Sequence, residues 1–555
     1  MRYYMKTISY NNIKLWILSL HKKDIAAFLI AFAFAIVFSI FSILQYYSLN
    51  TSAFDLGINA QILYTFLHTG SFYTPVLGTN AFAQHFTLFK FVQLPIYYIF
   101  PSPISIMVFE DIFIASGGYI VYLISTQMFQ GHIKSEKIIF SLSIAFLLSY
   151  EFSPFSLSLV SFPFHYMAFL PFFFLLAFYA FLTEKRALHF ISLVFIISLH
   201  ASFVYIAGIL LLYEFLFIHT SRGNIIKVWF SRKSNPGGIR NFSYFIIILV
   251  VLYAYLVVAA MLKMYFAGVY TFSLSPSIGE AGAPASSPMG LISLLFNNHS
   301  KFLAIIETHR TNKIFYFNLL FKSNIYLPLF SPLSLIMTLP YILVAFSSSY
   351  QSYYQLGYQY SAMVIGAMFI STIIGTYNII RLGKYIQIRY NKFRKNNFKI
   401  SNIRYDEPAG IAIIIIIIII VLIITMPYGI FSPVSEQNTT YSTMQNIHKE
   451  IPNGAASFVI NVSDHIPEKS YILTGNILMP YFSDHLYVYA APISQGYYTN
   501  LQKIQYIILQ NNSFWSMQGG QHSLQNIVNM ELKSGNYTII DEYKPQNILV
   551  LKKVQ

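Results

Sequence analysis

Acidic, histidine and amide side chains interrupt an apolar sequence at a few points, and these residues could do chemistry. Asp55 lies in the segment FDLGINAQ, which ends at Gln61 and directly follows the first long apolar run. A carboxylate at this place can take a proton from a hydroxyl group as a general base. It can equally accept backbone N–H bonds at the start of a helix and favour the helix dipole. Both roles stay open from the residue type alone.

Ionisable residues also occur inside or beside other apolar runs. Glu110 and Asp111 lie within the run 103–129, where a charged group is costly and usually faces a polar cavity or a partner. The other candidates are residues that a solvated turn or an interfacial position would also explain, since a single histidine is more often structural than catalytic. They are His85, Glu151, His165 and His200.

The familiar signatures of soluble enzymes are absent from the sequence. It contains no Gly-rich phosphate loop, His-Glu-x-x-His, Gly-x-Ser-x-Gly or kinase motif. The remaining acids, histidines, tyrosines and amides suit a reaction in which a carboxylate deprotonates a hydroxyl while a divalent cation or a basic group holds a departing phosphate. A divalent cation is one of these two options, with Asp55 and Glu151 as its candidate ligands.

Composition places the chain among polytopic membrane proteins. Of its 555 residues, 56% are hydrophobic and only 10% are charged, and it has no cysteine. Its net charge of +15 comes from Lys and Arg before residue 24 and in short loops such as 222–240 and 381–404. Such loops mark the cytoplasmic side of a membrane, so the charge indicates orientation and does not indicate nucleic-acid binding.

Apolar run lengths predict an all-α bundle of about eleven membrane spans, because one crossing needs about 20 apolar residues. The proline-containing segment 311–347 is expected to cross twice, since the basic loop 381–404 must lie inside. The N-terminus is then cytoplasmic and the C-terminus lies outside the cell membrane. The single runs are 25–47, 103–129, 138–152, 163–182, 187–200, 202–219, 241–262, 357–379 and 409–431.

The C-terminal part differs from the rest in pattern. Residues 433–555 contain five short runs typical of strands and one helical segment, NILMPYFSD, which predicts a small α/β domain outside the membrane. The chain thus divides into a cytoplasmic tail over 1–24, a transmembrane domain over 25–432 and this outer domain. The transmembrane domain carries the outer loops 48–102 and 263–310. In the first loop, the spacing of apolar residues after Phe54 predicts an amphipathic helix in the membrane interface.

Several segments taken together resemble one prokaryotic family. These segments are FDLGINAQ, QHFTLFKFVQLPIYYIFPSP, FPFHYMAFLPFFFLLAF, YLPLFSPLSLIMTLPYILVAFSSS and YQYSAMVIGAMFI, in this order between about residues 50 and 380, and YILTGNILMPYFSDHLYVYAAP in the tail. The chain resembles the polytopic membrane family known as domain-of-unknown-function family 2079. The family's layout is similar to that of C-type (GT-C) membrane glycosyltransferases, which use polyprenyl-phosphate sugars.

This resemblance implies roles for particular residues. It implies that Asp55 is the general base for an acceptor hydroxyl or a ligand to a metal near the donor phosphate. His85 and His165 match histidines of the family, and Tyr358 opens one matching segment. Two departures are visible: SLHASF, with His200 and Ser202, replaces a Lys-Glu-Asp-like set, and Leu56 follows Asp55 where related enzymes carry a second acid.

Two hypotheses follow. The first is a glycosyltransferase that takes sugar from a polyprenyl phosphate at the outer leaflet and acts on an envelope glycoprotein or lipid. It predicts one lipid-facing cavity formed by Asp55, His85, His165, Glu151 and either Glu110 or Asp111. The second, favoured by the two departures, is a non-catalytic glycan or lipid binder or a scaffold in the envelope. The low charge and abundant Ile, Tyr and Asn fit an archaeal envelope.

Overall fold

The computed structural model describes most of the chain. Most of the predicted N-terminal tail, 1–24, and much of the predicted outer loop 263–310 lie outside the described residues. The described residues are 22–221, 242–268, 296–393, 407–428, 430–431, 454–491, 493–494, 501–510 and 524–554.

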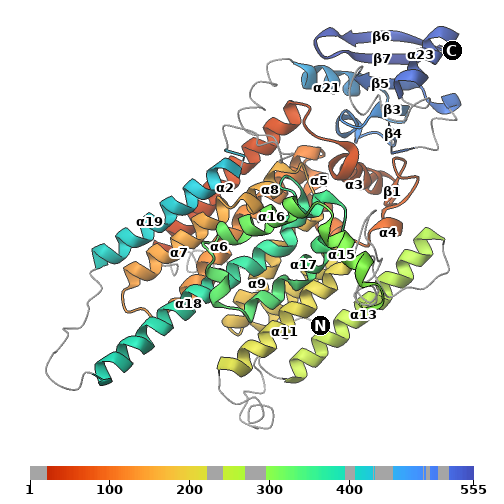
Figure 1. The fold of residues 1–555 in the computed structure, drawn as a ribbon. Coiled ribbons are helices and arrows are strands. Elements are labelled where there is room, and N and C mark those ends of the chain that lie inside the picture. The colour runs from red at the N-terminus through yellow and green to blue at the C-terminus, as the bar shows by residue number, and fades with distance from the viewer. Residues whose placement is uncertain are drawn as a thin grey trace, which may run out of the picture.

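Long apolar helices form a bundle (Figure 1). Among the described residues, four helices are long and apolar enough to cross a membrane, and a fifth crossing is formed if the bent pair α7 and α8 counts as one span. The two members of that pair meet at 43°. These elements are α2 (Lys22–Tyr47), α6 (Pro103–Phe129), α13 (Phe242–Ala267) and α18 (Ala362–Phe393), with the pair α7 (Glu136–Glu151) and α8 (Pro154–Ser161).

Shorter apolar helices fill the remaining predicted runs. α9 packs against α10 and α6, and α19 packs against α7. Each is shorter than the about 20 residues of a typical crossing, so the total of about eleven spans stays a prediction. These elements are η2 (Tyr166–Phe169), α9 (Leu170–Leu182), α10 (Arg186–Leu199), η3 (Ala201–Phe203), α11 (Val204–Ser221), α19 (Glu407–Thr425) and η8 (Met426–Tyr428).

The segment that was expected to cross twice forms short elements instead of two long helices. Prolines at 328, 332 and 340 interrupt it, because proline lacks the N–H that a helix interior needs. A loop with two more short turns then leads into α18. The elements are α15 (His299–Glu307), α16 (Arg310–Lys322), η4 (Leu327–Phe330), η5 (Ser334–Thr338), α17 (Leu339–Phe346), η6 (Gln351–Tyr354) and η7 (Gln359–Ser361).

The first outer loop folds into a compact layer on top of the bundle. The helix predicted there exists as α3, but it does not lie free in the interface, since residues 59–65 are all buried. The C-terminal domain covers it, which corrects that expectation. The elements of this layer are the π-helical turn η1 (Ala53–Gly57), α3 (Ile58–Thr69), the hairpin β1 (Tyr73–Thr74) and β2 (Thr79–Asn80), α4 (Ala81–Gln84) and α5 (Lys90–Ile99).

The C-terminal domain contains a five-stranded sheet in the order β4-β3-β5-β7-β6, and its strands fall where the sequence predicts them. β3 pairs in parallel with β4 and β5, whereas β7 pairs antiparallel with β5 and β6. The predicted helix NILMPYFSD is reduced to the turn η10. The elements are α21 (Ala455–His465), β3 (Tyr471–Gly475), η10 (Met479–Phe482), β4 (Tyr487–Ala491), η12 (Leu501–Lys503), β5 (Tyr506–Gln510), α23 (Leu524–Ser534), β6 (Tyr537–Tyr543), η14 (Lys544–Gln546) and β7 (Ile548–Lys553).

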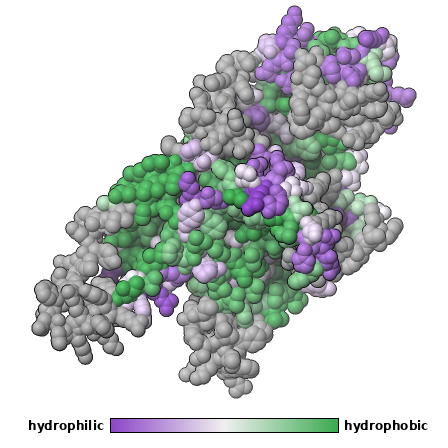
Figure 2. All heavy atoms as spheres, in the orientation of Figure 1, coloured by the Kyte–Doolittle hydropathy of each residue, from purple (hydrophilic) through white to green (hydrophobic). Residues whose placement is uncertain are grey.

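The surface separates into an apolar and a polar region. Apolar residues cover the bundle face shown in Figure 2, while hydrophilic residues gather on the C-terminal domain and along the boundary beneath it. Phe32 of α2 is 53% exposed, Val250 of α13 is 61% exposed and Ile423 of α19 is 66% exposed. Such exposure of large apolar side chains is favourable only against lipid or another apolar surface.

Close packing of α18 on η4 gives a test of the bundle. A Cβ at Gly375 would lie 2.0 Å from the backbone oxygen of Leu327, so Gly375→Ala forces the η4 backbone away. We expect a loss of about 1–3 kcal/mol of stability. Gly383→Ala in the same helix is the control, because a Cβ there meets nothing within 4 Å. Thermal unfolding in detergent micelles measures both, and equal midpoints would contradict this packing.

Candidate functional site

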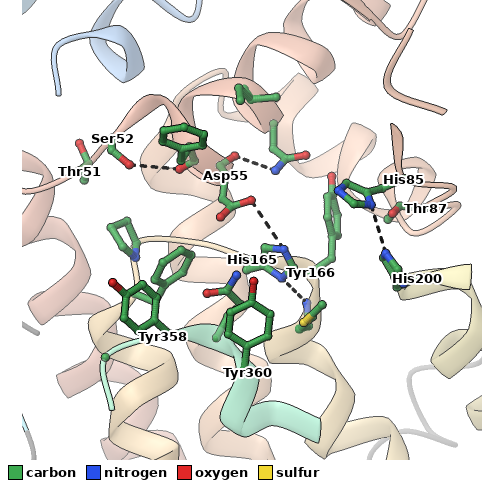
Figure 3. Close-up of a pocket in the computed structure, with 18 of the residues that line it drawn as sticks. Thr51, Ser52, Asp55, His85, Thr87, His165, Tyr166, His200, Tyr358 and Tyr360 are labelled. Carbon is green, nitrogen blue, oxygen red and sulfur yellow. Dashed lines mark hydrogen bonds and ion pairs between the residues drawn. The ribbon is translucent and has the colours of Figure 1, made fainter. Parts of the chain in front are cut away.

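A pocket lies where the bundle, the first outer loop and the C-terminal domain meet (Figure 3). Its volume is about 1020 Å³. That is room for a sugar phosphate or a similar ligand, since small-molecule sites measure roughly 300–1,000 Å³. Asp55, His85, His165, His200 and Tyr358 all line it, so five of the predicted site residues come together here.

Asp55 has an unusual backbone conformation at the pocket wall. Its φ of 64° and ψ of −66° lie in the positive-φ half of the Ramachandran plot, which residues other than glycine rarely adopt. These angles match the classic γ-turn, which is rare and strained. Such strain costs of order 1–3 kcal/mol and gathers at functional sites. The N-cap residue of α3 is Gly57, so Asp55 does not occupy the cap position that the sequence also allowed.

The carboxylate of Asp55 faces His165. His165 Nε2 lies 3.6 Å from Asp55 Oδ1, and the two side chains are only 17% and 29% exposed. The backbone N–H of Met167 donates to His165 Nδ1 at 3.0 Å, so this nitrogen carries no proton. The ring is therefore neutral, with its single proton on Nε2, directed at the carboxylate. The pair orients Asp55 without neutralising its charge.

A second histidine pair lies on the other side of the pocket. Ser202 N–H donates to His200 Nδ1 at 3.2 Å, which places the proton of a neutral His200 ring on Nε2. That nitrogen lies 3.2 Å from His85 Nδ1, which accepts the bond. His85 is thereby also left with its proton on Nε2. The SLHASF segment thus supplies neutral N–H and hydroxyl groups here.

Lys90 is the pocket's buried cation, and sequence analysis missed it. It is 3% exposed, and its ammonium lies 4.3 Å from the centre of the Tyr166 ring. Burial lowers the pKa of Lys90 to about 7, although the charge of Asp55 opposes that shift. The signal was present, because Lys90 is the one Lys or Arg between Lys23 and Lys134. A single lysine in so long a stretch does not form the excess of Lys and Arg that marks a cytoplasmic loop, so membrane orientation does not explain it.

Tyr358 reaches the pocket on a loop that α8 fixes in place. Ser158 Oγ accepts from Gly357 N–H at 2.7 Å and donates to the Tyr358 carbonyl at 3.1 Å. The ring centre of Tyr358 lies 6.3 Å from that of Phe162. Further aromatic rings line the same wall, and Figure 3 shows the Tyr358 and Tyr360 rings beneath Asp55.

The paired acids of α6 do not line the pocket. Glu110 is buried beneath it and accepts from the backbone N–H of His165 at 3.2 Å, so it supports the histidine without facing a substrate. Asp111 is buried toward α2, where it bonds to Ser42. The prediction that one of these acids faces the cavity is therefore wrong, because adjacent helical residues point about 100° apart and both point into helix contacts.

Gln61 and Glu151 also lie away from the pocket lining. Gln61 donates to the Val488 carbonyl at 3.3 Å and accepts from Thr74 Oγ1 at 2.6 Å, so it joins α3 to the C-terminal domain. Glu151 is fully buried against α6, where a Cβ at Gly118 would lie 2.1 Å from its Oε1. The predicted convergence of Glu151 with Asp55 is corrected, and so is Gln61 as a donor-binding candidate, since both side chains are committed to packing between elements.

The expected metal ligands do not form a site together. Asp55 lines the pocket and Glu151 does not. Across the described ranges, no group of three or more His, Asp or Glu side chains is arranged to hold a metal ion. Asp55 and Glu151 therefore do not hold one cation between them, and no step of the chemistry below is assigned to a cation.

The helices define a multi-pass membrane protein with a small C-terminal α/β domain. Within that class, the chain belongs to the family described as predicted membrane protein (DUF2079), which matches residues 45–551 and confirms the resemblance seen in the sequence. A search of curated proteins finds no match.

Solved structures of glycosyltransferases are similar over most of the chain. ArnT from Cupriavidus metallidurans, bound to undecaprenyl phosphate, is 10% identical, with a TM-score of 0.47 over 94% of this chain and 98% of that chain. Its apo form is 11% identical with the same TM-score and coverage. The apo oligosaccharyltransferase from Archaeoglobus fulgidus is 11% identical, with a TM-score of 0.43 over 95% of this chain and 74% of that chain.

The burial of Lys90 makes a prediction about stability. Its folded-state pKa lies below the value of about 10.4 for a free lysine, so the unfolded chain binds more protons. The free-energy cost of burying the charged Lys90 ammonium is therefore largest below pH 7, and it disappears as pH rises toward about 10.4. We expect Lys90→Met to raise the thermal midpoint at pH 6 and to leave it almost unchanged at pH 10.

A matched lysine provides the control for this prediction. Lys313 is also buried, but its ammonium donates to the Ile305 carbonyl at 2.8 Å and the Phe346 carbonyl at 2.9 Å. Lys313→Met would remove both bonds, although the Ile305 carbonyl keeps its bond from the Thr308 N–H, and should destabilise the protein by about 1–3 kcal/mol. A Lys90→Met variant that loses stability as Lys313→Met does would show that Lys90 is structural.

Proposed function

We propose that this protein is a glycosyltransferase-like membrane enzyme that transfers a sugar from a polyprenyl-phosphate donor to an acceptor hydroxyl at the outer leaflet. One observation carries the proposal: a strained, histidine-oriented carboxylate and a buried ammonium line one pocket. Asp55 is the group that can accept a proton, and Lys90 is the group that can hold an anion.

The chemistry assigned to these side chains balances without a further reactant. As the acceptor oxygen forms its bond to the anomeric carbon of the sugar, its proton passes to Asp55. The bond between that carbon and the phosphate oxygen breaks, and the phosphate departs with the electron pair. Lys90 in its charged form stabilises that phosphate, and the Nε2–H of His85, which points to neither of the other two histidines' acceptors, is a further donor.

The lining suits both ends of such a donor. Aromatic rings from the loops 162–166 and 350–360 offer flat apolar faces to a sugar ring. The apolar bundle beneath the pocket, visible in Figure 2, offers a surface for a polyprenyl chain. A divalent cation and an envelope glycoprotein acceptor remain proposals of the same kind, to be decided by adding each to the assay.

The first test is turnover by the purified protein of a panel of polyprenyl-phosphate sugars, with and without divalent cation. Asp55→Asn keeps the shape of the side chain and removes the base, so we expect transfer to fall at least about 100-fold. Asp24→Asn is the matched control. Asp24 lies in α2 and accepts a hydrogen bond from Tyr122 Oη of α6, and it does not line the pocket. If no donor is turned over and Asp55→Asn changes nothing, the non-catalytic binder becomes the better description.

Lys90 gives the binding step a pH dependence. The ammonium is charged below its pKa of about 7, so affinity for a polyprenyl monophosphate should fall as pH rises from 6 to 8.5. Lys90→Arg keeps its charge over this range and should remove the fall, whereas Lys90→Met should bind weakly throughout. Binding isotherms at four pH values measure this. Parallel curves for wild type and Lys90→Arg would exclude Lys90 from phosphate recognition.

A further inference from the structure

The turn that carries Asp55 is also the place where the C-terminal domain meets the membrane bundle. The backbone N–H of Ala53 donates to the carbonyl of Asn476 at 2.7 Å, across more than 400 residues of sequence. η1 packs against η10 of the domain. In Figure 1 the strands β3 and β4 lie directly over α3, which follows the turn. The strained segment is thus covered from outside by another domain.

Gly57 shows how closely the domain approaches the turn. Its φ of −61° and ψ of −47° are helical, so any residue could adopt this backbone. A Cβ there would lie 2.3 Å from Met479 Sδ and 3.4 Å from Pro480. A larger residue at this position would therefore have to displace the Met479 side chain, which belongs to the C-terminal domain.

Contacts on both sides of the turn fix the domain in place. Before the turn, Tyr481 Oη donates to the Tyr46 carbonyl at the end of α2, and the two rings lie 4.5 Å apart. After it, Gln61 bonds to Val488 of β4. Ala53 itself belongs to the hydrophobic core of the domain. The domain core therefore includes residues of the segment that it covers.

The turn is also bonded within the loop, where the Gly57 N–H donates to the Ser52 carbonyl at 3.2 Å. Within the loop, Ser52 Oγ donates to the Phe54 carbonyl at 3.3 Å, and Asn59 Nδ2 donates to the Asp55 carbonyl at 2.7 Å. A conformation that costs of order 1–3 kcal/mol persists only when the surrounding structure over-determines it. The contacts from Asn476 and Met479 supply that external constraint.

We propose that the C-terminal domain is a positioning element for Asp55: through the Asn476 carbonyl and the Met479 side chain it holds the turn in the conformation that presents the carboxylate to His165. This inference rests on the proposed role of Asp55 in transfer. Asn476 also lines the pocket, so the residue that holds the turn forms part of the binding wall. Displacing the domain would relax the turn and move the carboxylate away.

A pair of substitutions tests this coupling by rescue. Gly57→Ala puts a methyl group against Met479 Sδ and should displace the Met479 side chain from the turn. Met479→Ala removes the obstructing atom, so the double variant Gly57→Ala/Met479→Ala should recover. Gly208→Ala in α11 is the control, because a Cβ there meets nothing within 4 Å. Non-additivity of this kind is expected only for residues in direct contact.

The primary readout is hydrogen exchange of the backbone amides of residues 52–58 in the full-length protein, which needs no substrate. We expect Gly57→Ala to speed exchange of the Ala53 and Gly57 amides at least tenfold, with the double variant close to wild type. Asn476→Ala keeps its backbone carbonyl and should leave this protection in place. Unchanged exchange in Gly57→Ala, or no recovery in the double variant, would overturn the proposal.

Turnover of the polyprenyl-phosphate sugar panel is the second readout. Gly57→Ala should lower kcat at least tenfold with a smaller change in KM, because the base is displaced while the anion side of the pocket is intact. The double variant should regain kcat. Loss of exchange protection together with an unchanged kcat would overturn the positioning role. Absence of turnover in wild type would instead refute the proposed function and leave the exchange result to decide the coupling alone.

Discussion

The backbone conformation of Asp55 is the constraint on which the rest of the site depends. A residue with a side chain adopts this conformation only under support, and here the support comes from three directions. The loop itself contributes Ser52 and Asn59, the bundle contributes His165, and the C-terminal domain contributes Asn476. The three parts of the chain therefore meet at one turn, and the pocket lies where they meet.

The pocket has neutral histidines and a buried ammonium group, that of Lys90, along its wall. Hydrogen bonds from backbone N–H groups to Nδ1 keep His165 and His200 neutral, so neither competes with Lys90 for an anion. Lys90 has no hydrogen-bond acceptor among the residues that the structure describes, and it keeps its charge only near neutral pH or below. A protein that needed only stability would place an apolar side chain there. The cost suggests selection for a ligand.

The sequence predicted the helices and strands more accurately than it predicted the contacts between them. Apolar run lengths located the helices of the bundle, and alternation located all five strands of the C-terminal sheet, because both patterns are local. The convergence of His85 and His165 with Asp55 was predicted from the family resemblance, and His200 joins them in the structure. Glu151 and Gln61 were misplaced because burial between elements is decided by tertiary packing. Lys90 was missed because a single lysine carries no motif, although its isolation in the sequence was a usable signal.

The shared core at the top of the bundle affects how this protein could have evolved and how it can be engineered. Tyr46, Leu49 and Ala53 pack in one hydrophobic cluster with Val459, Ile472 and Val488. A C-terminal fragment cut before α21 would expose its half of that cluster to water, so it is not a module that can be moved intact between proteins. Exchange between relatives would require the end of α2, the η1 turn and the β3–η10 segment to be transferred together, as one discontinuous unit of inheritance.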